Sequence, residues 1–147
     1  MQPRLRVFFD SSVIIAGSFS SEGASYILLQ LAGLTLLDGR ISSFVRIESE
    51  RNIRQKLPAA LPAFHTLLNE ALTEDAEPTE EQIAAAANFA DAKDVHILAA
   101  ALHQKCHYLI TLNERDFWPA PEQIHVLRPG PFLQTIRAHI NQLESDP

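Results

Sequence analysis

Short apolar runs of strand length alternate along this chain with longer segments of helical length, and that alternation limits the folds it can adopt. Aromatic and β-branched residues typical of buried strands occupy 5–10, 34–39, 107–112 and 123–127. Parallel strands need crossover connections of about the length that separates these runs. The sequence therefore predicts an α/β domain with a mainly parallel central sheet.

The segments between the strands carry the signals of helices. Ser42 or Ser43 can serve as the N-cap of one of them, because a serine hydroxyl accepts a hydrogen bond from the first turn. The predicted helices cover 22–33, 42–57, a stretch from 63 into an acidic loop near Pro78, 80–90, 94–105, and a tail from about 131. The acidic loop is read as a solvated surface.

Composition indicates one soluble domain over 1–147. The chain has 147 residues, 46% of them apolar, which is enough to bury a core. Cys106 is the only cysteine, and no secretion signal or apolar run of about 20 residues is present, so a cytoplasmic protein is expected. The formal net charge of -6 is unfavourable for bulk attraction to nucleic acid. A polyanionic substrate would need an arginine cluster or a bound cation.

Polar side chains gather where two predicted strands end. Asp10 closes the first strand, and Asn113 and Asp116 follow the strand at 107–112. Ligands of parallel sheets bind beyond the carboxyl ends of the strands, so these groups are expected at one edge of the sheet. An aspartate in such a place, Asp94 included, can also act only as a helix cap. The joint placement of these polar groups at one edge of the sheet favours a functional site over separate helix caps.

Four segments together resemble the signature segments of PIN domains, the metal-dependent ribonuclease fold of VapC-like toxins. They read FFDSSVIIAG, ISSFVRIESERNI, DAKDVHILAAAL and YLITLNERDF, in this order, and the resemblance spans about Arg6 to Val126. It implies a three-layer α/β/α fold and an endoribonuclease that uses Mg²⁺ or Mn²⁺. It also implies an RNA substrate, an antitoxin protein as partner, and a homodimer.

The resemblance also assigns site residues by position. The catalytic acids are Asp10, Glu48, Asp94 and Asp116, and the metal ligands are Asp10, Asp94, Asp116 and Asn113. Ser12 stands where the family often has a polar residue, and it is assigned to substrate binding with Arg46 and Arg51. The arginines could hold flanking phosphates or act as ordinary surface charges.

Two positions stay open. Many relatives carry an aspartate two residues after the threonine, where this chain has Asn113, so either Asn113 or Asp116 is the fourth ligand. In the second segment Glu48 matches the family spacing from Ser42, with Glu50 as the alternative.

The chemistry follows from the residue types. Crowded carboxylates raise each other's pKa unless a cation neutralises them, and an all-oxygen set suits Mg²⁺ or Mn²⁺ better than zinc. The expected reaction is phosphodiester hydrolysis leaving a 5′-phosphate and a 3′-hydroxyl, with one or two metal ions. The competing interpretation is a PIN-like fold that has lost catalysis and serves as an RNA-binding or protein-interaction module.

Overall fold

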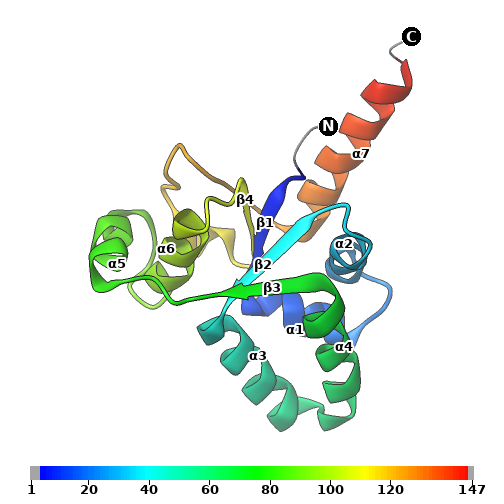
Figure 1. Ribbon diagram of the computed structural model, residues 1–147, viewed down its shortest axis with the longest axis horizontal. Helices are drawn as coiled ribbons and strands as arrows, with labels where there is room; N and C mark the ends of the chain where they lie inside the picture. Colours follow the sequence, from blue (N-terminus) through cyan, green and yellow to red (C-terminus); the bar gives the residue numbers. More distant parts are fainter. Residues whose placement is uncertain (1–3, 146–147) are drawn as a thin grey trace.

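A computed structural model describes residues 4–145 of the chain. Its centre is a five-stranded sheet in the order β3-β2-β1-β4-β5, and all four pairings are parallel (Figure 1). The strands are β1 (Arg6–Phe9), β2 (Asp38–Ser42), β3 (Leu72–Asp75), β4 (Tyr108–Ile110) and β5 (His125–Leu127). The predicted parallel α/β fold is confirmed.

Helices connect the strands. They are α1 (Ser11–Phe19), α2 (Ala24–Gly33), α3 (Ser43–Lys56), α4 (Leu61–Ala71), α5 (Glu80–Ala86), α6 (Val95–His103) and α7 (Pro129–Ser145). Three short 3-10 helices complete the set: η1 (Pro58–Ala60), η2 (Ala87–Phe89) and η3 (Glu114–Phe117). The domain predicted over 1–147 also includes 1–3 and 146–147, which lie outside the described residues.

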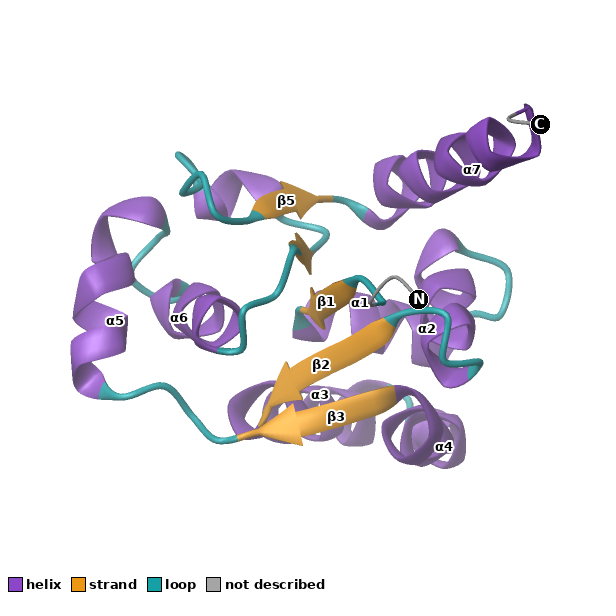
Figure 2. Ribbon diagram, turned by 45° about the horizontal axis from the view of Figure 1, so that its top comes forward, coloured by secondary structure: helices purple, strands orange, loops and turns teal. Residues whose placement is uncertain are grey.

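The helices form two layers around the sheet. Figure 2 shows α5 and α6 on one side of the strands and α2 and α4 on the other, with α3 running beside β2 and β3. Helix α7 leaves the body at one end, so that its last turns project away from the sheet (Figure 1). The predicted three-layer α/β/α arrangement is confirmed.

The central strand β1 is the most deeply buried part of the sheet. Val7, Phe8 and Phe9 are each 0% exposed, because β2 and β4 cover the two edges and helices cover both faces. Burying a large apolar side chain contributes about 1.5–3 kcal/mol, so β1 is the main anchor of the fold. Asp10 directly follows this buried strand, so the strand fixes its position.

The structure departs from the predicted elements in three places. Strand β2 begins at Asp38 rather than at 34, because Leu34 and Leu36 are exposed and Thr35 adopts a φ of 63° in a surface turn. Strand β3 falls within the predicted acidic loop, and helix α1 was not among the predicted elements. The remaining predicted strands and helices are present, with α7 starting at Pro129.

Helices α1 and α2 are the apolar helices that could be considered for a membrane span. Within residues 4–145 no single helix is long and apolar enough to cross a membrane. Helices α1 and α2 reach the required length only as a pair, and the pair is bent by 98°.

Candidate functional site

A cleft of about 660 Å³ opens where the chain leaves β1 and β4. Its walls come from the start of α1, one face of α3, the turn before α6, and the segment after β4. The predicted site residues that line it are Asp10, Ser12, Glu48, Arg51, Asp94, Asn113 and Asp116. The fold thus brings together side chains that are up to 106 positions apart in sequence, at the edge where ligands of parallel sheets bind.

Asp10 is held on both of its carboxylate oxygens. Oδ1 accepts a hydrogen bond from the Ser11 backbone N–H (2.8 Å), which caps α1. Oδ2 accepts from the hydroxyls of Ser12 (3.0 Å) and Thr111 (2.7 Å). The side chain is only 6% exposed, and these donors fix its orientation toward the cleft.

Glu48 reaches the same cleft from α3. Its Oε1 accepts a hydrogen bond of 3.2 Å from the Ser11 hydroxyl, so α3 and α1 are joined beside Asp10. Glu50 points elsewhere and lies within 3.5 Å of the Arg54 guanidinium and 3.6 Å of the His65 ring. Of the two alternatives left open by the sequence, only Glu48 lines the cleft.

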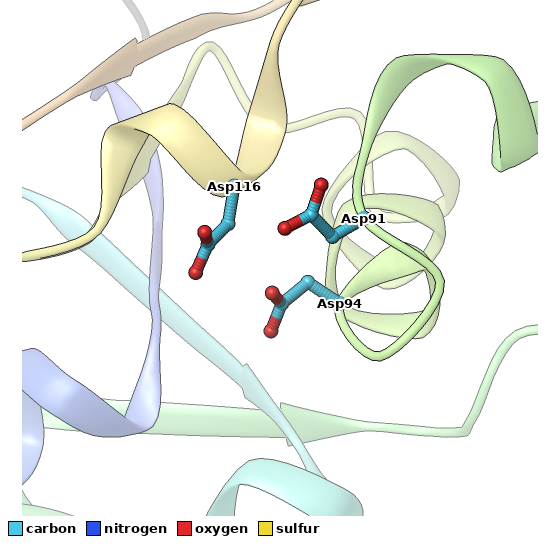
Figure 3. Close-up of side chains that lie close together, drawn as sticks. All are labelled: Asp91, Asp94 and Asp116. Carbon is cyan, nitrogen blue, oxygen red and sulfur yellow. The ribbon is translucent and has the colours of Figure 1, made fainter.

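Three aspartates, of which Asp94 and Asp116 line the cleft, converge on one point. Asp91, Asp94 and Asp116 each offer a carboxylate oxygen, and these oxygens lie within 4.8 Å of one another. Figure 3 shows Asp91 and Asp94 from the turn before α6 directed toward Asp116 of η3. Asp91 was not a predicted site residue, because its place near a helix start suggested a cap. Its signal was the spacing DAKD, which puts two carboxylates on one turn.

Backbone contacts hold the two halves of this aspartate cluster together. The Asp91 N–H donates to the Asp116 carbonyl at 2.7 Å, and the Asp94 N–H donates to the Asp91 carbonyl at 2.8 Å. Lys93, largely exposed, lies 3.8 Å from Asp116. One largely exposed lysine does not balance three carboxylates, so the cluster keeps excess negative charge.

The pKa of Asp94 is raised in this environment. Burial, followed by the negative charges of Asp116 and Asp10, raises the pKa of Asp94 to about 6, although Lys93 acts in the opposite direction. Asp94 stands at the N-cap position of α6, yet its side chain makes no capping hydrogen bond within the described residues. Its Oδ2 is buried and accepts no hydrogen bond from any residue of 4–145. The capping interpretation therefore does not explain this aspartate.

The donor set fits a hard divalent cation. A buried carboxylate oxygen without a partner is costly, and a cation at this point would supply the missing interaction. The converging groups are oxygens, which such cations prefer. Asp10 and Asn113 line the same cleft but lie outside the group of three within 4.8 Å.

The other predicted binding residues divide into two groups. Ser12 and Arg51 line the cleft, and the Ser12 hydroxyl also accepts from the Leu112 N–H at 3.1 Å. Arg46 does not line it, because its guanidinium pairs with Glu74 of β3 at 2.6 Å. The strand that the sequence did not predict is thus the reason that Arg46 is turned away from the cleft.

Comparison with known proteins supplies the family. A family model described as PIN domain matches residues 6–115. The chain belongs to the PIN domain family. The match ends one residue before Asp116, so the last member of the aspartate cluster falls just outside the matched stretch.

Two solved structures share the fold of this PIN domain. One is VapBC2 from Rickettsia felis bound to a DNA fragment from its promoter, with a TM-score of 0.62, 12% identity, and coverage of 83% of this chain and 97% of that chain. The other is FitAB bound to the IR36 DNA fragment, with a TM-score of 0.59, 16% identity, and coverage of 84% and 94%. At these identities the likeness concerns the fold alone. No curated protein sequence matches the chain.

Proposed function

We propose that this PIN domain is a metal-dependent endoribonuclease that hydrolyses RNA phosphodiester bonds, with Mg²⁺ or Mn²⁺ as the cofactor. Family membership supports a nuclease, since PIN domains are typically nucleases. The observation that carries the proposal is Asp94, whose buried Oδ2 accepts no hydrogen bond within the described chain and which lies beside two further aspartates. Such uncompensated negative charge suits a cation and not a bare phosphate.

The proposed ligands are oxygens on two sides of the cleft. Asp94 and Asp116, joined by Asp91, would hold the cation on one side, and Asp10 would approach it from the end of β1. When bound, a divalent cation lowers the pKa of a coordinated water and stabilises negative charge on a phosphate. All-oxygen coordination favours Mg²⁺ or Mn²⁺ over zinc.

The chain's own residues orient the substrate and take up protons. Glu48, fixed by the Ser11 hydroxyl, is placed to accept a proton from an attacking water. Arg51 is placed to bind a flanking phosphate through charge-assisted hydrogen bonds. Ser12 and Thr111 keep the Asp10 carboxylate from rotating. Hydrolysis by this arrangement leaves a 5′-phosphate and a 3′-hydroxyl.

The function is tested by cleavage of single-stranded and structured RNA with the full chain. Cleavage is expected with Mg²⁺ or Mn²⁺ and is expected to stop with EDTA. Glu48→Gln should abolish turnover, whereas the matched control Glu50→Gln should not, because Glu50 lies outside the cleft. Undiminished cleavage in EDTA would contradict the proposal.

A toxin role within a toxin-antitoxin pair is the proposed biological setting. It is supported by the two structures of the same fold, whose VapBC and FitAB complexes are bound to DNA fragments. On this proposal an antitoxin protein is the partner and the toxin forms a homodimer. Co-expression with the product of an adjacent reading frame, followed by co-purification, would test the pairing.

The alternative is an inactive PIN-like module that binds RNA or protein. Metal affinity separates the two proposals, because a module without catalysis has no need for the aspartate cluster. Calorimetric titration that gives no Mn²⁺ binding at neutral pH would favour the inactive module.

A further inference from the structure

We propose that the exposed face of α3 beside the carboxylates is a stacking site for one unpaired nucleobase next to the scissile phosphate, with Phe44 as its platform. This inference deepens the proposed function, on which it rests, by assigning the residue on which a base of the RNA stacks. It concerns the exposed apolar part of the cleft, to which neither the acidic residues nor the family match assigns a role.

One helical face carries the feature. Phe44, Ile47, Glu48 and Arg51 are spaced i, i+3, i+4 and i+7, so they lie in a row along α3, and all four line the cleft. The row is apolar at the start of the helix, acidic in the middle and basic at its end. Its length is about 10 Å, from seven residues at about 1.5 Å each.

The apolar end is open to solvent. Phe44 is 41% exposed and Ile47 is 47% exposed, and Ile15 of α1 extends the same apolar wall. Aromatic side chains at the mouth of a phosphodiesterase cleft offer a flat surface on which any base can stack. In single-stranded RNA the unpaired bases are free to do so, whereas in an RNA duplex they are not.

The Phe44 platform is held in place before any ligand arrives. The Phe44 N–H donates to Glu77 Oε1 at 2.6 Å, and the Ser43 hydroxyl donates to the same oxygen at 2.7 Å. The ring of His96 packs against the Phe44 ring in a T-shaped contact, with centroids 3.9 Å apart. The Glu77 contacts fix the backbone and the His96 ring restrains the Phe44 side chain, so little conformational entropy is lost when a base binds.

The charge at the other end of the row selects a nucleotide over an apolar peptide. Arg51 lines the cleft and forms no ion pair with any described carboxylate, in contrast to its neighbours Arg46 and Arg54. A base on Phe44, a scissile phosphate beside Glu48 and a second phosphate on Arg51 would match the row in order. An apolar peptide would leave both the carboxylates and Arg51 unmatched.

The test measures binding separately from cleavage. Fluorescence anisotropy with labelled single-stranded RNA, in Ca²⁺ to supply a hard cation, gives the Kd of the full chain. Phe44→Ala should raise this Kd about 5- to 150-fold, the range of one lost stacking contact, while Phe44→Tyr should keep wild-type affinity. Phe19→Ala is the matched control, because Phe19 is 39% exposed on α1 and does not line the cleft.

A second comparison uses the ligand. Replacing the RNA by a fully paired duplex of the same sequence should weaken wild-type binding and remove the difference between wild type and Phe44→Ala. Circular dichroism and melting of each variant confirm that the fold is kept.

The outcomes are distinguishable from failure of the proposed function. RNA binding that depends on Phe44 without any metal-dependent cleavage would support the stacking site and contradict the nuclease. Cleavage by the wild type with equal RNA affinity of Phe44→Ala would overturn the stacking site alone. If Phe44→Ala leaves RNA affinity unchanged but weakens self-association, the face is a protein interface and the inference is wrong.

Discussion

The hydroxyl of Thr111 donates a 2.7 Å hydrogen bond to Oδ2 of Asp10, which ties the end of β4 to the end of β1 across 101 positions of sequence. Both residues are buried, with exposed fractions of 0% and 6%. The Thr111 hydroxyl also accepts from the Asn113 N–H at 3.1 Å. One side chain therefore sets both the Asp10 carboxylate and the path of the chain toward η3.

Thr111→Val tests this link, because valine keeps the shape and removes the donor. The loss of a buried hydrogen bond to a carboxylate should lower the free energy of unfolding by about 1.5–3 kcal/mol. Cleavage should fall as well, since Asp10 loses the shortest of its hydroxyl hydrogen bonds. Urea unfolding measures the first effect. The control is Thr135→Val on α7, whose hydroxyl makes only an exposed contact with the Pro131 carbonyl.

Asp10→Asn tests whether Asp10 is a ligand or a cap. Asparagine keeps an oxygen that can accept from the Ser11 N–H, so α1 stays capped, while the negative charge is lost. Activity should therefore fall by orders of magnitude while the fold persists. Near-UV circular dichroism and RNA cleavage are measured on the same preparation. A variant that fails to fold would show that Asp10 is mainly structural.

The sequence predicted the parallel sheet well, because buried strands such as β1 and β4 are dense in apolar residues. It failed at β3, since Leu72–Asp75 is an edge strand whose last three residues are exposed and polar, which resembles a loop in sequence. It also misplaced β2, because two exposed leucines in a turn look like strand residues. The partners of β3 lie 33 positions away in β2, which a local pattern does not show. The two leucines are instead held in the turn by hydrogen bonds to the end of α2.

The same limit applies to the site. Strand-end position and the family resemblance were enough to place Asp10, Glu48, Asp94 and Asp116 beside one cleft. They could not reveal that Arg46 pairs with Glu74, because that contact depends on β3. Nor could they reveal Asp91, whose carboxylate meets Asp116 only through the turn geometry before α6.

The pKa of Asp94 makes the stability of the metal-free protein depend on pH. The folded pKa of about 6 is higher than the unfolded value of 3.8, so the folded state binds this proton more tightly. The resulting stabilisation is present in full below pH 3.8 and is lost as pH rises through 6.

Asp94→Asn should therefore raise the free energy of unfolding of the metal-free protein at pH 7. Solvent screening of this partly exposed group limits the gain to the order of 1 kcal/mol. Below about pH 4 the gain should vanish, because both states of the wild type are then protonated. Urea unfolding of both proteins in EDTA, at pH 4 and at pH 7.5, measures this gain in the free energy of unfolding. A gain that is equal at both pH values would exclude charge repulsion as its cause.

Arg46 and Arg51 lie five positions apart on α3 and should behave differently. Arg46→Ala removes a half-exposed ion pair with Glu74, so it should cost less than about 1 kcal/mol of stability and leave cleavage unchanged. Arg51→Ala should weaken RNA binding and reduce the slope of log affinity against log salt by about 0.7, the value for one phosphate contact on a single strand. A salt titration of both variants decides whether Arg51 contacts phosphate.

The last prediction concerns which residues after β4 hold the cation. Asp116 shares the aspartate cluster with Asp91 and Asp94, whereas Asn113 lines the cleft outside that group. Charge counts for more than a neutral amide oxygen at a hard ion. Asp116→Ala should therefore weaken Mn²⁺ binding more than Asn113→Ala does, as measured by calorimetric titration at pH 7.5.

Asp91→Ala provides the third arm of this titration. Asp91 is exposed, so its loss should weaken Mn²⁺ binding less than the loss of Asp116, while the backbone contact from its N–H to the Asp116 carbonyl is kept. If Asn113→Ala instead gives the greatest loss of the three, the amide is the ligand. Asp116 would then serve the turn at η3, where the Asp116 N–H already donates to the Asn113 carbonyl at 3.0 Å.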